Sequence, residues 1–232
     1  MKKYALLALI LLMGAGFNSP AQARKPAPTP VPPPPPGLSL TASKWIMLGG
    51  LYGNPISGAM HNDANGNLYF DFGTSAAASN NDLYTTSGPT ILNGTIHITG
   101  NITALSGTPV ITYDTTDNPC GSAPTFRPYF EMAKPKKNDP YFYQYNRWYS
   151  NSLAAPLQTG PVTLDVPVTS GYWSSVTGIQ ANQDAQSLQY FNTAKSTVWK
   201  LGLAMGGGCF YGHGVYVTGG TARFTITSIQ IQ

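Results

Sequence analysis

An aromatic run is the part of this sequence whose residue types and spacing best suit binding chemistry. Residues 141–149 read YFYQYNRWY, six aromatic side chains in nine positions. Successive side chains of an extended strand point to opposite faces. One face would then carry Tyr141, Tyr143, Tyr145, Arg147 and Tyr149. Aromatic rings stack on the C–H faces of sugars and guanidinium groups bond hydroxyls, so the run predicts a carbohydrate-binding face. The alternative is that each tyrosine is an ordinary strand or core residue.

A glycine-rich stretch is a second candidate for the binding site. Residues 206–214 read GGGCFYGHG, and glycine permits positive φ and close approach of backbone. The segment either lines a cleft with Tyr211 and His213 directed into it, or forms a tight turn held by a disulfide at Cys209. No G-K-[ST] sequence follows, so it is not a phosphate-binding loop.

Carboxylates are too few and too scattered to identify a catalytic pair. Glu131 is the one glutamate, beside eight aspartates. Glycoside hydrolysis generally uses two facing carboxyl groups, and no spacing here favours a pair. Most aspartates lie in turn-like contexts, where they bond local backbone. A hydrolase or lyase that uses Glu131 or an aspartate is therefore the third hypothesis, after two non-catalytic ones, and the protein is more simply not an enzyme.

Metal-binding patterns are weak, and no cofactor is predicted. The histidines, His61, His97 and His213, have no spacing that implies convergence on one metal. Residues 63–67 and 114–118 are rich in side-chain oxygens, as calcium loops are, but lack the later glutamate of an EF-hand. A structural calcium ion is one interpretation of these segments. An ordinary Asx-turn is the other.

The N-terminus predicts export. Residues 1–23 have a basic start, an apolar run and a final Ala21-Gln22-Ala23, as in a cleavable signal peptide. Residues 24–37 hold eight prolines, a polyproline spacer before a domain at 38–232. We expect the mature chain to be periplasmic or extracellular, with no membrane span after cleavage. An uncleaved anchor is the alternative.

Charge and cysteines fit that setting. The chain has 13 basic and 9 acidic residues, and loss of Lys2 and Lys3 leaves 11 against 9. No extended basic stripe exists, so nucleic acid is not an expected partner. Export permits disulfides, and Cys120 and Cys209, the two cysteines, most simply pair with each other. The alternative is two buried free thiols.

The elements that must position these residues are strands. Segments of alternating polarity, rich in β-branched and aromatic residues, recur between turn signals: 68–72, 95–99, 101–103, 110–113, 162–166 and 222–231. In the last, Ala222, Phe224, Ile226 and Ser228 would share the buried face. We predict an all-β fold, a jelly-roll-like antiparallel β-sandwich with one short helix.

The helix is predicted at residues 184–195. Leu188, Phe191 and Ala194 recur there at helical spacing, and Asp184 (or Asn182) can cap its start. We expect this helix to pack over an edge or end of the sandwich. The tryptophans outside the aromatic run, namely Trp45, Trp173 and Trp199, are interpreted as core residues.

The C-terminal half resembles a family of exported bacterial β-sandwich proteins without assigned activity. The resemblance rests on residues 173–176, 206–215 and 219–224 with the helix that contains Phe191, and it covers roughly residue 68 to the C-terminus. The architecture also resembles jelly-roll modules of galactose-binding-like topology that are attached to polysaccharide enzymes. That resemblance implies non-catalytic binding of a glycan. The second hypothesis is a structural or adhesive envelope protein that binds a protein partner through a sheet edge.

Overall fold

The computed structural model describes residues 37–50, 53–113, 122–133, 139–207 and 212–232. The chain separates into two units, Met1–Pro34 and Pro35–Gln232, and every strand of the described residues belongs to the second. The predicted signal peptide lies outside the described residues, as does the spacer apart from Gly37. Cys120, Cys209 and the disulfide predicted between them lie outside as well. No helix in the described ranges is long and apolar enough to cross a membrane.

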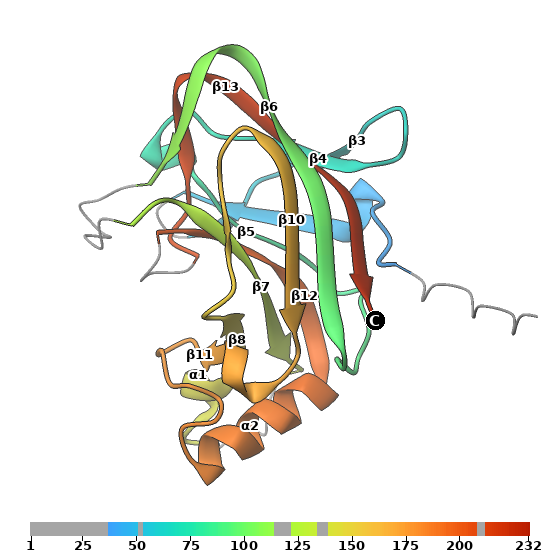
Figure 1. The fold of residues 1–232 in the computed structure, drawn as a ribbon, viewed down its shortest axis with the longest axis vertical. Helices are drawn as coiled ribbons and strands as arrows, with labels where there is room; N and C mark the ends of the chain where they lie inside the picture. Colours follow the sequence, from blue (N-terminus) through green and yellow to red (C-terminus); the bar gives the residue numbers. More distant parts are fainter. Residues whose placement is uncertain (1–36, 51–52, 114–121, 134–138, 208–211) are drawn as a thin grey trace, which may run out of the picture. The chain divides into compact units, whose positions relative to one another are not determined.

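The second unit is an antiparallel β-sandwich, as predicted (Figure 1). The larger sheet has the order β11-β8-β7-β12-β5-β1-β2, with β9 paired to β7. Its strands are β1 (Trp45–Gly49), β2 (Asn54–Pro55), β5 (Asn80–Thr85), β7 (Thr125–Met132), β8 (Arg147–Ser150), β9 (Ala155–Pro156), β11 (Trp173–Ser175) and β12 (Val198–Gly206). The smaller sheet has the order β10-β6-β13-β4-β3. Its strands are β3 (His61–Asn62), β4 (Leu68–Asp71), β6 (Thr95–Thr112), β10 (Gly160–Pro167) and β13 (Tyr216–Ile231).

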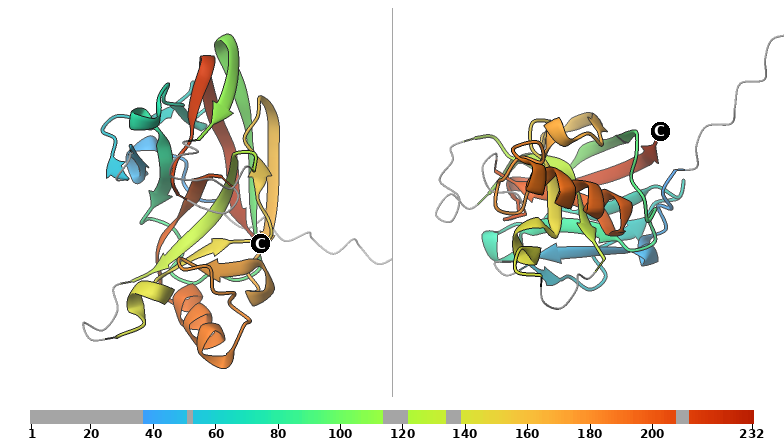
Figure 2. Two further views of the ribbon diagram at one scale, coloured as in Figure 1. Left: turned by 90° about the vertical axis from the view of Figure 1, so that its left-hand side faces the viewer. Right: turned by 90° about the horizontal axis from the view of Figure 1, so that it is seen from below.

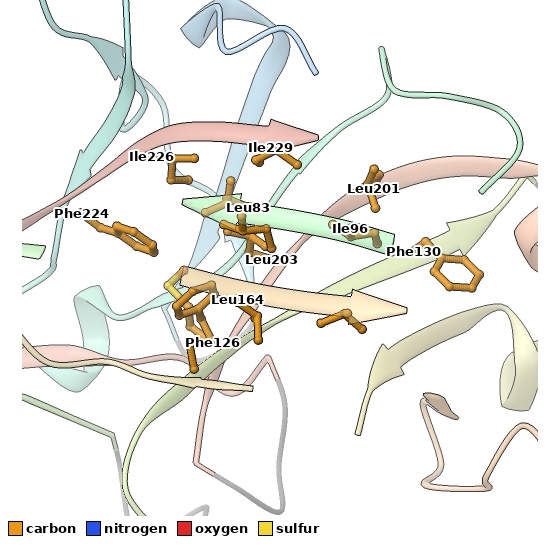
Figure 3. Close-up of a cluster of buried hydrophobic side chains, with 14 of the residues drawn as sticks. Leu83, Ile96, Phe126, Phe130, Leu164, Leu201, Leu203, Phe224, Ile226 and Ile229 are labelled. Atoms are coloured by element: carbon orange, nitrogen blue, oxygen red, sulfur yellow. The ribbon is translucent and has the colours of Figure 1, made fainter. Parts of the chain in front are cut away.

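The core lies between the two sheets and is built from alternate residues of each strand. Figure 3 shows a cluster of these side chains, among them Phe126 and Phe130 of the larger sheet and Ile96, Leu164 and Phe224 of the smaller one. Each of these side chains is buried. Because the side-chain period of a strand is two, every second residue of the larger sheet must point away from this core. Those outward residues form the candidate site.

The strand β6 is longer than the sequence suggests. The pattern predicts an interruption at Gly100, but residues 95–112 form one strand paired with β13. A Cβ at Gly100 would lie 2.5 Å from the Thr225 carbonyl oxygen, so glycine here permits close approach of two strands. Farther along β6, Gly107 has φ +62° and lies at a bulge in the pairing with β13.

The C-terminal strand β13 confirms most of its predicted pattern. Ala222, Phe224 and Ile226 are buried as expected. The prediction for Ser228 is wrong, because the register shifts between Ile226 and Ser228 and places Ile229 in the core instead. A bulge reverses the alternation beyond its position, which no period-two pattern anticipates.

The predicted helix is α2 (Ala185–Ser196), and it lies across one end of the sandwich (Figures 1 and 2). Asp184 caps it, accepting a hydrogen bond from the Ser187 backbone N–H at 2.7 Å. Phe191 is buried, with its ring 5.3 Å from Trp148. Leu188 is exposed, contrary to expectation, and Ser187 takes a buried position on the helix.

The remaining helical turns are short. A four-residue helix α1 (Phe142–Tyr145) was not expected, and three 3₁₀ turns are η1 (Ala42–Lys44), η2 (Ala76–Ala78) and η3 (Ser170–Tyr172). Of the three tryptophans interpreted as core, Trp45 and Trp173 are buried, whereas Trp199 is 42% exposed. That correction matters for the site, because a β-bulge between Val198 and Lys200 turns the Trp199 ring outward.

Candidate functional site

The outer face of the larger sheet holds a group of aromatic and charged side chains on four adjacent strands. They alternate with core residues: Tyr129 lies beside buried Phe130 on β7, and Tyr149 beside buried Trp148 on β8. We call this group the tyrosine–arginine cluster. Its members are Asp82 and Tyr84 of β5, Tyr129 and Glu131 of β7, Arg147 and Tyr149 of β8, and Lys200 of β12.

Glu131 is the acceptor at the centre of the cluster. The Arg147 guanidinium donates to its Oε1, and Lys200 Nζ lies 2.8 Å from its Oε2. Arg147 also donates from Nη1 to the Tyr149 hydroxyl at 2.9 Å. Glu131 is buried, so two cations compensate its charge where water cannot. The side chains of this face are therefore held in fixed positions.

Asp82 is the least satisfied member of the cluster. Arg147 Nη1 lies 3.6 Å from its Oδ2, and its buried Oδ1 has no hydrogen-bond partner among the described residues. The Asp82 pKa is raised to about 6, chiefly by burial and also by the Glu131 charge, against the opposing effect of Arg147 and Lys200. Gly212 lies directly over this carboxylate, since a Cβ there would be 3.0 Å from Oδ1. Asp82 is thus closed to a large ligand.

The rings of the cluster lie close to one another. Tyr129 and Tyr149 have centroids 5.6 Å apart, and the Arg147 guanidinium carbon lies 5.4 Å and 6.0 Å from the two centroids. The Tyr129 hydroxyl is buried without a partner among the described residues. Burial raises the pKa of both tyrosines. This inner part of the cluster is closely packed, and both tyrosines stay in the neutral form.

The accessible end of the cluster is formed by Tyr84, Trp199 and Lys200, which we call the aromatic shelf. Lys200 Nζ lies 4.7 Å from the Tyr84 ring centroid and 4.5 Å from the Trp199 ring. Trp199 is 42% exposed and Tyr84 is half-buried. Ile46, opposite Tyr84 on β1, extends this apolar surface and is 41% exposed. Trp199 and, in part, Tyr84 thus face solvent, and the Lys200 ammonium group lies close to both rings.

The aromatic run does not form the single extended face expected from the sequence. Residues 142–145 form the helix α1, so Tyr141, Tyr143 and Tyr145 do not share a strand face with Arg147 and Tyr149. Tyr145 is buried and its ring stacks on Tyr190 at 4.7 Å. Tyr141 and Tyr143 are exposed. The physical reason is a turn: the Asp139 carboxylate accepts the Tyr141 backbone N–H at 2.9 Å, which starts a helical turn.

Arg147 and Tyr149 do share a face as predicted, since both belong to β8 and lie in the cluster. Tyr211 lies outside the described residues. His213 is exposed in the turn between Gly212 (φ +72°) and Gly214 (φ +90°). A Cβ at Gly214 would lie 2.4 Å from Asn81 Oδ1, which favours the tight-turn interpretation of that part of the glycine-rich segment.

Sequence reasoning missed Asp82, Tyr84 and Lys200. The signal was present in residues 80–85, NNDLYT, where Asp82 and Tyr84 alternate with Leu83. That segment is a half-buried strand by its period of two. Trp199 could not be found in this way, because the bulge that exposes it leaves no mark in the alternation.

The candidate metal ligands do not converge. His97 pairs with Asp165 at 2.7 Å, while His61 stacks on Tyr69. The described residues contain no group of three histidine, cysteine or acidic side chains that could hold a metal. Asp63 Oδ1 accepts hydrogen bonds from the backbone N–H groups of Asn65 and Asn67, each at 2.9 Å. Residues 63–67 therefore form an Asx-turn, the second of the two interpretations of this segment. The second oxygen-rich segment, 114–118, lies outside the described residues.

Comparison with solved structures finds a remote likeness to carbohydrate-binding modules, as the sequence suggested. A xylan-binding module, CBM15, has 12% identity over 81% of this chain and 93% of that one, with a TM-score of 0.36. A proposed sugar-binding protein from Bacteroides thetaiotaomicron has 13% identity over 83% and 89%, with a TM-score of 0.30. No protein-family model and no curated protein sequence matches the chain. At these TM-scores the likeness says nothing of the side chains that bind.

Proposed function

We propose that this protein is a non-catalytic binding module for carbohydrate and that the aromatic shelf receives the sugar. The observation that carries the proposal is the pair of outward rings, Tyr84 and Trp199, whose centroids lie 4.7 Å and 4.5 Å from Lys200 Nζ. Sugar rings present an apolar C–H face that packs on aromatic rings, while their hydroxyls need donors and acceptors at the edge. Lys200 supplies donors at that edge.

The rigid cluster behind the shelf supports this function. Glu131 holds Lys200 in place at 2.8 Å, and Arg147 holds Glu131. A shelf whose side chains are already fixed loses little conformational entropy when a ligand settles on it. The cations are paired with carboxylates, so the face suits a neutral polysaccharide rather than a polyanion.

Hydrolysis by Glu131 is less well supported than binding. Both of its carboxylate oxygens are engaged, one by Arg147 and one by Lys200, and its side chain is buried. A nucleophile or general base must reach the substrate. Asp82 is similarly enclosed beneath Gly212. Neither carboxylate is placed to act on a sugar that rests on the shelf.

Binding of an envelope protein through a sheet edge is the alternative function. The observation in its favour is that β10 pairs with β6 only at Thr95–Ile102, which leaves residues 103–112 without a partner on that side among the described strands. However, Pro109 and the bulge at Gly107 are both features that protect the edge of a sheet from pairing with another strand. We therefore place carbohydrate binding first. Export to the periplasm or the medium remains a prediction that fits both functions.

Affinity electrophoresis through gels that contain xylan, mannan, β-glucan or galactan tests the proposal. The native protein should be retarded by at least one of them. Trp199→Ala and Tyr84→Ala should each weaken binding by about tenfold or more, the equivalent of one lost stacking contact. Tyr143→Ala is the matched control, because Tyr143 is 81% exposed on α1 and lies outside the shelf. Equal retardation of all variants, or loss in Tyr143→Ala alone, would refute the shelf as the site.

A further inference from the structure

A cleft of about 880 Å³ lies away from the aromatic shelf, where the two sheets meet beside η2. Its walls come from the end of β1, from β2 and the segment after it, and from β3 and β4 of the smaller sheet. In Figure 2 (left) these early elements, blue to teal, gather on one side of the unit. The volume is typical of a small-molecule site, and Ala77 and Ala78 of η2 keep it open because they have short side chains.

Polar groups of the cleft are fixed by their neighbours. Asp71 accepts Arg223 Nε at 2.7 Å and Nη2 at 3.0 Å, one bond on each oxygen, which leaves further acceptor capacity. Asn80 is buried and its Oδ1 accepts the Gly73 backbone N–H at 2.8 Å. Its NH₂ group remains as a donor at the wall of the cleft. The cleft therefore offers an acceptor and a donor that cannot easily turn away.

The rest of the cleft wall includes the His61 ring and the side chains of Pro55 and Ile56. His61 lies parallel to Tyr69, with centroids 5.2 Å apart and planes at 24°. The Arg223 guanidinium carbon lies 3.8 Å from the Tyr69 ring centroid. His61, Tyr69 and Arg223 thus support one another. Pro55 and Ile56 add aliphatic surface.

The charge and the size of the cleft restrict the kind of ligand that it can bind. Asp71 is neutralised by Arg223, and the lining residues include no lysine or arginine, so nothing in the cleft favours an anion. One acceptor, one donor, a flat aromatic ring and two aliphatic side chains together suit a molecule with hydroxyls on a C–H framework. We infer that this cleft is a second binding site, for an uncharged mono- or disaccharide. The choice of a sugar as the ligand rests on the proposed function, whereas the cleft and its lining residues do not depend on it.

Saturation-transfer NMR with D-glucose, D-galactose and D-xylose tests the inference. At least one sugar should bind the native protein. Ala77→Trp should fill the cleft from an exposed position, and His61→Ala should remove one wall, each weakening binding by about tenfold or more. Tyr143→Ala is the control and should leave monosaccharide binding unchanged, because Tyr143 lies on α1, outside both the cleft and the shelf. Trp199→Ala is measured beside it to show whether a monosaccharide binds the shelf instead.

Three results would overturn the inference: no sugar of the three binds, binding survives both cleft variants, or it is lost in Trp199→Ala while Ala77→Trp keeps it. Failure of the proposed function looks different. In that case polysaccharide retardation would not depend on Trp199, whatever the monosaccharides do. Near-ultraviolet circular dichroism of each variant separates loss of a site from loss of the fold.

Discussion

Replacement of Asp82 by asparagine should stabilise the protein near neutral pH. The carboxylate is buried, its Oδ1 has no hydrogen-bond partner among the described residues, and its pKa rises from 3.8 to about 6. That difference corresponds to about 3 kcal/mol against the charged form in the folded state. The folded chain therefore binds this proton more readily than the unfolded chain, so the contribution of Asp82 to stability is greatest below pH 4. It falls as pH rises from about 4 to beyond 6.

Asparagine does not ionise, so the advantage of Asp82→Asn over the native protein should grow by up to about 3 kcal/mol between pH 4 and pH 7.5. Urea unfolding followed by tryptophan fluorescence measures this difference at each pH. Asp184→Asn is the control with the opposite sign, because hydrogen bonds from Ser187 lower the Asp184 pKa and its charge stabilises the fold above pH 4. If the effect of Asp82→Asn were independent of pH, or destabilising chiefly at pH 7.5, the reasoning about this buried carboxylate would be wrong.

Two further stability predictions concern packing. Gly202→Ala should destabilise the fold by about 1–3 kcal/mol or more, because its Cβ would lie 2.1 Å from the Leu83 carbonyl oxygen and 2.9 Å from Tyr129, and an unchanged urea midpoint would contradict this. Phe191→Ala should cost about 3–5 kcal/mol, because Phe191 joins α2 to Trp148 in the core. A loss below about 1 kcal/mol would mean that the helix contributes little to the folded state.

The sequence predicted those features of the fold that depend on short-range pattern. Alternation identified parts of β4, β6, β10 and β13, and the cap at Asp184 identified the start of α2. It failed where an extra residue changes the register. Because of the bulge after Ile226, Ile229 lies in the core where the alternation predicts Ser228. Nothing local in a sequence distinguishes a bulged strand from a regular one, since the partner strand decides.

The candidate site was predicted only in part, for a related reason. Arg147 and Tyr149 were correctly placed on one face, but the residues before them form a helical turn begun by Asp139. A run of aromatic residues is compatible with a strand or with a helix packed against α2. The chain forms the helix, in which the Tyr145 ring stacks on Tyr190 of α2. Lys200 lies on another strand, and its position beside Glu131 depends on long-range pairing of β12 with β7.

The central claim is that sugar rests on the aromatic shelf, and Trp199 can report it directly. All four tryptophans are described; Trp45, Trp148 and Trp173 are buried, while Trp199 is 42% exposed. Acrylamide should therefore quench mainly Trp199 in the free protein. Saturation with the soluble polysaccharide that retards the protein should protect this fluorescence, and Trp199→Phe should abolish the protected component. Bound polysaccharide with undiminished quenching of Trp199 would contradict the account.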